Sequence, residues 1–240
     1  MQLKIRLKLN EPLKLPLSYN HIVQSALLNL GRGDQSSYAE NLHDEVNGEQ
    51  IYRYYCFGPL RGKSKVYNGK IEFLETLELE VRSLSESWIR EIENQVSTKG
   101  MIIGKTRLIP EWTELSDKKI YSDAVHIKMV SPIVVHTTDV ETNHTNYYSP
   151  ENEEFYTLIK TNFTNKWRNF YGCEPREEIS IEKLNVEPKD KLVTKYKGYF
   201  YITAWGGEYM LHGTPEALNF LYNAGVGTKN SQGFGMMEIL

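Results

Sequence analysis

A glycine-rich segment near the end of the chain has the composition of an anion-binding loop. Residues 225–235 read Gly-Val-Gly-Thr-Lys-Asn-Ser-Gln-Gly-Phe-Gly, so two Gly-hydrophobic-Gly triplets enclose five polar residues. Glycine allows positive φ and close approach between backbones, which lets amide N–H groups converge on a phosphate. Lys229 adds a positive charge, and Asn230 and Ser231 add neutral donors. A plain structural turn is the alternative, and the segment is not a P-loop, because no Gly-Lys-Ser/Thr follows at the required spacing. The four glycines are Gly225, Gly227, Gly233 and Gly235.

Basic residues form clusters, although the formal net charge is only −3. A net charge near zero argues against a nucleic-acid partner at first, but a phosphate-binding surface needs only local positive potential. Acidic residues concentrate elsewhere, above all between Glu72 and Glu93. We therefore expect one basic and one acidic side, with solvated surface lysines as the alternative. The candidate phosphate contacts are Lys4, Arg6 and Lys8, then Arg61, Lys63 and Lys65. A further group flanks a predicted hairpin, with Asp190 between its members: Lys189, Lys191, Lys195 and Lys197. The tyrosines of these strands either stack on bases or pack in a core.

Composition excludes several classes of protein. The 240 residues are 25% charged and 40% hydrophobic, which excludes wholesale disorder. No apolar run approaches the roughly 20 residues of a membrane span, and the first residues do not open a signal peptide. Cys56 and Cys173 are far apart, and no Cys/His cluster has the spacing of metal ligands. We expect a soluble, cytoplasmic protein with no metal, cofactor or membrane partner.

Hydrophobic periodicity predicts the elements of the first half. Leu3, Ile5, Leu7 and Leu9 alternate with polar residues, as in a half-buried strand with a cationic outer row. A helix follows Pro16, and a short second helix opens on the capping box at residues 37–40. The remaining predicted elements are strands 51–57 and 70–79, joined by a basic linker, a helix at 85–96 and a strand at 101–108.

The second half repeats this order. The predicted elements are a strand at 125–135 interrupted near Pro132, a helix at 155–170, strands at 179–187 and 196–205 with 208–211 as an extension, a helix at 215–224 and a strand at 236–240. Each half therefore reads β-α-β-β-α-β. This order predicts an α+β fold of two tandem ferredoxin-like (RRM-like) domains. We place the N-terminal domain at residues 1–118 and the C-terminal domain, which holds the glycine-rich loop, at 119–240.

After two such units, the loop resembles the glycine-rich signature of the RAMP superfamily. More narrowly, nearly the whole chain resembles the CRISPR-associated endoribonucleases that cut repeat RNA into guide RNAs. The matching segments are Pro16-Leu17-Ser18-Tyr19-Asn20-His21, Leu42-His43, Phe57-Gly58-Pro59-Leu60, Ser131-Pro132-Ile133, Thr203-Ala204-Trp205 and the run of residues 229–235. The final run is specific in its spacing, and the other segments corroborate it.

The resemblance implies metal-independent cleavage of an RNA phosphodiester. The 2′-hydroxyl attacks in line and gives a 2′,3′-cyclic phosphate and a 5′-hydroxyl end. A histidine of the N-terminal unit serves as acid or base in many members, and His43 matches it. By its position on a helical wheel alone, His43 lies at the margin of an apolar stripe, where a purely structural role is the alternative. Repeat RNA is the implied partner, with CRISPR effector-complex proteins and a second copy of the chain as further candidates.

The chain also departs from the family pattern. Leu28 stands where members carry a tyrosine on the first helix, and no lysine follows His43 closely. His21 lies seven residues before Leu28 on the same helix face, so it is a second catalytic candidate; a local hydrogen bond at the helix start is its alternative role. Arg61, Lys63 and Lys65 are candidates for charge at the scissile phosphate. The rival function is a catalytically weak or inactive RAMP subunit that binds guide RNA in an effector complex.

Overall fold

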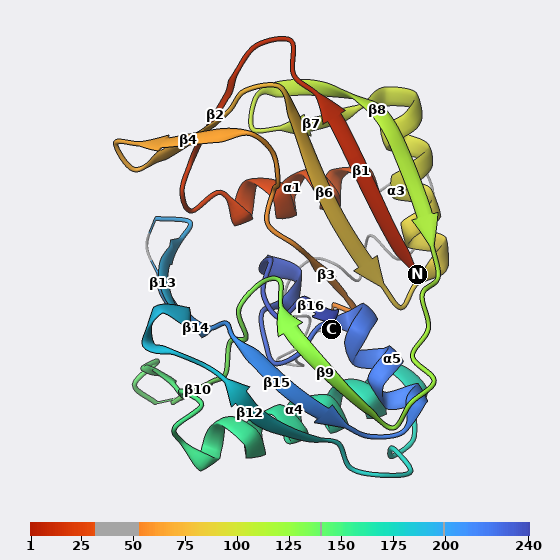
Figure 1. Ribbon diagram of the computed structural model, residues 1–240, viewed down its shortest axis with the longest axis vertical. Coiled ribbons are helices and arrows are strands. Elements are labelled where there is room, and N and C mark those ends of the chain that lie inside the picture. The colour runs from red at the N-terminus through yellow and green to blue at the C-terminus, as the bar shows by residue number, and fades with distance from the viewer. Residues whose placement is uncertain (32–52, 140, 199) are drawn as a thin grey trace.

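The computed structural model describes residues 1–31, 53–139, 141–198 and 200–240 (Figure 1). In the N-terminal half the described elements are β1 (Gln2–Lys8), β2 (Leu13–Pro16), α1 (Asn20–Gly31), β3 (Tyr55–Phe57), β4 (Ser64–Tyr67), β5 (Lys70–Phe73), β6 (Thr76–Ser83), α3 (Glu86–Lys99), β7 (Met101–Ile103) and β8 (Thr106–Ser116). The predicted helix that starts at residue 37 lies outside the described residues, and so does His43.

The N-terminal sheet has the strand order β3-β6-β1-β8-β7 among the described residues, and its named pairs are antiparallel. Leu3, Ile5 and Leu7 of β1 point to the buried face, where they meet Val23 and Leu27 of α1. The buried face of α3 packs on the same side of the sheet. Both helices therefore cover one face, as the ribbon shows (Figure 1), and the face of Lys4 and Arg6 is left without a helix.

The C-terminal half repeats the arrangement. Its described elements are β9 (Ala124–Met129), β10 (His136–Thr138), β11 (Thr145–Tyr147), α4 (Glu153–Tyr171), β12 (Ser180–Asn185), the 3₁₀ turn η1 (Pro188–Asp190), β13 (Lys191–Tyr196), β14 (Phe200–Trp205), β15 (Glu208–His212), α5 (Pro215–Ala224), the 3₁₀ turn η2 (Asn230–Gln232) and β16 (Met237–Ile239). The sheet order is β12-β15-β9-β16. Apart from the extra edge strand β7, both sheets have the order 2-3-1-4 of a split βαβ unit when their strands are counted along each repeat, so the predicted pair of ferredoxin-like folds is confirmed. The division between residues 118 and 119 stays a prediction.

Three predicted strands differ from the structure. The strand at 70–79 is two strands, β5 and β6, interrupted at residues 74 and 75, and the strand at 101–108 is a hairpin that turns at Gly104. The strand at 196–205 is also wrong, because β13 and β14 form a separate hairpin and β15 is the strand that enters the sheet. Lys197 and Gly198 both have positive φ, which suits a tight turn between twisted strands. The basic linker is likewise part of a small sheet, with the order β2-β5-β4.

Contacts between the two units are buried. The guanidinium of Arg82 on β6 donates to the Met237 carbonyl oxygen at 2.7 Å and lies 3.9 Å above the Tyr222 ring centroid. Gln2 donates to the Asn223 side chain at 2.8 Å. These contacts fix the two sheets relative to each other. Within the described ranges, no helix is long and apolar enough to cross a membrane.

Candidate active site and RNA-binding residues

The glycine-rich loop connects α5 to β16, and its glycines are required by its backbone. All four have φ between 71° and 88°, a range that side chains rarely adopt. A Cβ on Gly235 would lie 2.0 Å from the Val226 carbonyl oxygen, and one on Gly227 would lie 2.6 Å from that of Val134. The expectation of positive φ and close backbone approach is therefore met.

A buried lysine of α4 forms hydrogen bonds to the glycine-rich loop. Lys166 of α4 is 4% exposed, and its ammonium donates to the Gly227 carbonyl oxygen at 2.7 Å, to the Asn230 Oδ1 and, at 3.5 Å, to the Gly225 carbonyl oxygen. Burial lowers the pKa of Lys166 to about 7. Sequence reasoning missed this residue, although it falls on the apolar stripe of α4 with Phe155, Ile159 and Phe163.

Asn230 serves the loop interior rather than its surface. The side-chain amide donates to the carbonyl oxygens of Val226 at 2.9 Å and of Phe234 at 3.2 Å, and its own oxygen accepts from Lys166. Asn230 was predicted to contact RNA, and its buried, fully bonded side chain corrects that expectation: it closes the loop across its base. Lys229 and Ser231 are half-buried, and burial lowers the pKa of Lys229.

The first helix contacts the loop from the N-terminal unit. The Asn20 side chain donates to the Gln232 carbonyl oxygen at 3.0 Å. The neighbouring His21 has its Nδ1 2.9 Å from the Ser18 carbonyl oxygen, and its ring meets the Tyr196 ring edge-on at 6.1 Å. The carbonyl can only accept, so in the neutral ring Nδ1 carries the proton, and Nε2 is an acceptor with no hydrogen bond to any described residue. The local bond that we considered as the alternative role of His21 is thus present, and it fixes the tautomer of the neutral ring.

Hydroxyl and amide groups gather next to His21. The Tyr196 hydroxyl on β13 donates to the Gln24 Oε1 on α1, and burial raises the pKa of Tyr196 to about 12. Burial also raises the pKa of Tyr55 on β3, whose hydroxyl is near the side chains of Gln24 and Ser231. Four elements therefore meet at this point: α1, β3, β13 and the loop. Leu28 lies on the same helix but is half-buried against the N-terminal core. The face of α1 that carries Leu28 is therefore less exposed than predicted.

A second histidine contacts the glycine-rich loop at Thr228. His136 of β10 has its Nδ1 2.8 Å from the Thr228 hydroxyl, which itself donates to the Val134 carbonyl oxygen at 3.1 Å. The hydroxyl must therefore accept from Nδ1–H, which leaves Nε2 unprotonated. Burial and then the charge of Lys229 lower the pKa of His136 to about 4, so this ring is neutral at physiological pH. No motif in the sequence indicated it.

The cationic row of β1 is not a free basic surface. Arg6 pairs with Glu78 on β6 and with Glu111 on β8, each at 3.2 Å. Lys4 lies opposite Glu80 and Glu114 in the two strand registers. The prediction that acidic and basic stretches occupy separate sides is therefore wrong here, because strand pairing brings the acidic segment beside β1. Lys8 is exposed at the end of the strand, opposite Thr76.

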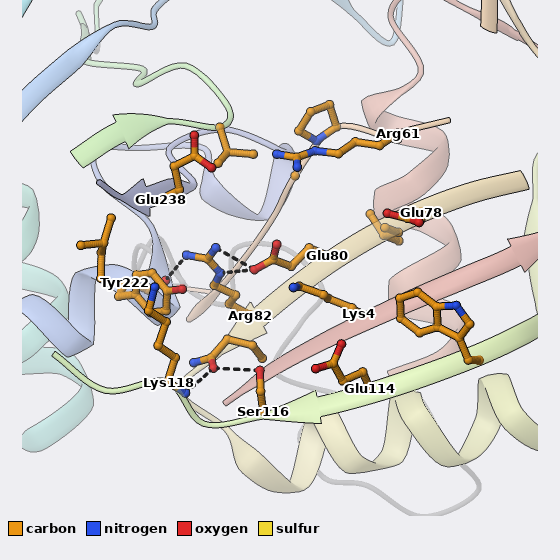
Figure 2. Close-up of a pocket in the computed structure, with 17 residues that line it drawn as sticks. Lys4, Arg61, Glu78, Glu80, Arg82, Glu114, Ser116, Lys118, Tyr222 and Glu238 are labelled. Carbon is orange, nitrogen blue, oxygen red and sulfur yellow. Dashed lines mark hydrogen bonds and ion pairs between the residues drawn. The ribbon is translucent and has the colours of Figure 1, made fainter. Parts of the chain in front are cut away.

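The basic residues after β3 are exposed but partly paired. Lys63 lies 2.8 Å from the Glu75 carboxylate, and Lys65 is opposite Glu72 in the β4–β5 register. Arg61 lines a cavity of about 420 Å³ between the open face of the N-terminal sheet and β16 (Figure 2). The labelled side chains around that cavity carry both signs of charge, and Arg82 is held there by Glu80.

Comparisons with known proteins agree with this architecture. The family model of CRISPR associated protein Cas6, C-terminal, matches residues 115–239. A CRISPR-associated endoribonuclease Cas6 from Pyrococcus furiosus is 26% identical over 231 residues, covering 94% of this chain and 84% of the relative. A putative CRISPR-associated endoribonuclease-like protein, Cas6nc, from Pyrococcus horikoshii is 26% identical over 94% of this chain and 93% of its own. The solved structure of a RAMP protein binding different RNA substrates has a TM-score of 0.83 at 24% identity, covering 100% of this chain and 99% of the other. The chain therefore belongs to the CRISPR-associated Cas6 family.

Proposed function

We propose that this protein is an endoribonuclease that cleaves CRISPR repeat RNA beside the glycine-rich loop. The observation that carries the proposal is the gathering of His21, Gln24 and Tyr196 against this loop in a member of the Cas6 family. The P. furiosus relative is named as an endoribonuclease, which supports the same activity. A cytoplasmic location, effector-complex partners and a homodimer stay predictions.

The proposed reaction needs no group beyond RNA and protein. The 2′-oxygen loses its proton to a base and attacks the adjacent phosphorus in line, the bond from phosphorus to the 5′-oxygen breaks, and the leaving oxygen takes up a proton. The products are a 2′,3′-cyclic phosphate and a 5′-hydroxyl. His43 is our first candidate for the acid or base, and His21, whose Nε2 has no hydrogen bond to a described residue, is the second. Lys229 is suited to stabilise charge on the phosphorane.

Product analysis tests the proposal. We would incubate the protein with a cognate repeat RNA in EDTA and identify the new ends. We expect a 2′,3′-cyclic phosphate end, lost in His43→Ala and retained in His144→Ala, an exposed loop histidine that serves as the control. Cleavage that survives His43→Ala but is lost in His21→Ala would move the catalytic role to α1.

One observation favours the rival function. Leu28 replaces the family tyrosine with a side chain that packs on the core and has no proton to donate. If the protein bound repeat RNA tightly and left it intact, it would be a RAMP subunit that holds guide RNA. If it bound no RNA at all, both functions would be wrong.

A further inference from the structure

The β13–β14 hairpin has an outer face that the fold leaves open. Cross-strand partners alternate between the two faces, and Ile202, Ala204 and Tyr196 are buried on the inner one. We call the opposite side the hairpin outer face. Its residues are Lys191, Val193 and Lys195 on β13, opposite Trp205, Thr203 and Tyr201 on β14. The three β13 residues and Tyr201 are exposed, whereas Thr203 and Trp205 are half-buried and Trp205 packs against the C-terminal core. In Figure 1 the hairpin lies at the left margin of the molecule.

Rings and positive charges alternate on this face. The Lys195 ammonium lies 5.1 Å from the Tyr201 ring centroid, and the Lys191 ammonium lies 5.6 Å from that of Trp205. Tyr201 is 59% exposed and Val193 is 54% exposed. A large aromatic side chain left so open, beside a cation, is available to a ligand that offers both a flat ring and a negative charge.

The positive charge of the hairpin is not neutralised by its own strands. Residues 191–205 contain no aspartate or glutamate. The nearest acidic residue in the chain, Asp190, accepts a hydrogen bond from the Glu187 backbone at 2.8 Å, and Glu187 itself pairs with Lys189. The contrast with β1, where Arg6 has two carboxylate partners, makes this hairpin the better place for phosphates.

The hairpin also leads to the candidate active site. Tyr196, at the end of β13, bonds to Gln24 and contacts His21. The two ring–lysine pairs are four residues apart along the strands, which is about 13 Å at ~3.3 Å per residue. That distance equals about four stacked bases at ~3.4 Å each.

We propose that the hairpin outer face binds an unpaired segment of the RNA substrate, with a base stacked on Tyr201 and phosphates at Lys191 and Lys195. The proposal rests on the proposed function and adds the part of the substrate that the hairpin recognises: single-stranded nucleotides flanking the cleavage site. A base has a π-face in any sequence, so recognition here is tolerant of sequence and sensitive to pairing.

The test compares RNA affinity among surface variants by fluorescence anisotropy with a labelled single-stranded repeat RNA. We expect Tyr201→Ala to weaken binding roughly 5- to 150-fold, the range for loss of one stacked base, while Tyr201→Phe keeps most of the affinity. Lys195→Ala should make the negative slope of log K against log salt shallower by ~0.7, because one phosphate contact is lost. Tyr121→Ala is the matched control, because Tyr121 is an exposed ring outside the hairpin.

Each outcome decides the proposal. Wild-type affinity in Tyr201→Ala, together with normal cleavage of repeat RNA, would overturn the stacking surface and leave the proposed function intact. An equal loss of affinity for a fully paired RNA duplex would also overturn it, because paired bases cannot stack on the ring. A wild-type protein that neither binds nor cleaves repeat RNA would refute the proposed function itself. Tyr201 is exposed, so unchanged thermal unfolding should accompany the loss of affinity.

Discussion

Replacement of Lys166 by methionine is expected to loosen the glycine-rich loop. The change keeps an unbranched side chain, one heavy atom shorter, and removes its donors, so the Gly227 carbonyl oxygen and the Asn230 Oδ1 lose their bonds to Lys166. Each buried acceptor left without a donor costs about 1–3 kcal/mol. Removal of the amine also removes the cost of burying it, which offsets part of the combined loss from the two acceptors. We expect a loss of about 3 kcal/mol in the free energy of unfolding. For a chain of this length, that lowers Tm by about 6–12 °C.

The pH dependence of the same variant gives a second measurement. The folded-state pKa of Lys166 is about 7, below its usual value of 10.5, so the unfolded state holds more protons between these two values. The stability that this group contributes to the wild type therefore rises as pH increases from about 7 toward 10, and Lys166→Met lacks this rise. Other groups are common to both proteins, so their contributions cancel in the difference.

Urea unfolding of both proteins at several pH values is the assay, and Lys160→Met on the same helix is the control. Lys160 is half-buried, without a contact to the loop among the recorded hydrogen bonds of the described residues. Equal stability of Lys166→Met and the wild type would refute the account of the loop. So would an equal loss in Lys160→Met, because the effect would then belong to α4 in general.

Two further changes probe the loop. Gly235→Ala places a Cβ 2.0 Å from a backbone oxygen, whereas Gly172→Ala, at a similar φ of 71°, meets nothing within 4 Å. Both variants carry the ~1–2 kcal/mol of left-handed strain, and thermal unfolding should show that Gly235→Ala loses at least ~2 kcal/mol more of the free energy of unfolding. Equal losses would contradict the close approach. Asn20→Ala removes the 3.0 Å bond to the Gln232 carbonyl oxygen and should lower the free energy of unfolding by ~1 kcal/mol. Chemical denaturation measures this loss, with the exposed Asn29→Ala as the control, and identical curves for the two variants would show that the bond contributes nothing.

The sequence predicted elements best where one face is apolar and the other polar. Leu3, Ile5 and Leu7 alternate with charged residues, and β1 follows this pattern because one side packs under helices and the other stays open. The strands of the hairpin were misplaced, with residues 196–205 predicted as one strand, because the turn between β13 and β14 depends on positive φ at Lys197 and Gly198, which hydrophobic periodicity does not indicate. The predicted separation of acidic and basic sides was wrong for a related reason. Glu78 and Arg6 are far apart in the chain, and only the register of β1 against β6 brings them together.

The candidate site was harder to predict because it is formed between the units rather than within one. Asn20 and Gln24 on α1 bond to the loop and to β13, which lie 212 and 172 residues away in the chain. Periodicity describes a face of one element and carries no information on which distant element will cover it. Arg82, buried between Glu80 and Tyr222, fixes this docking, and Lys166 fixes the loop that receives α1. His21 therefore owes its position to residues in both halves, and a change at the interface alters the site even where no residue of the site is replaced.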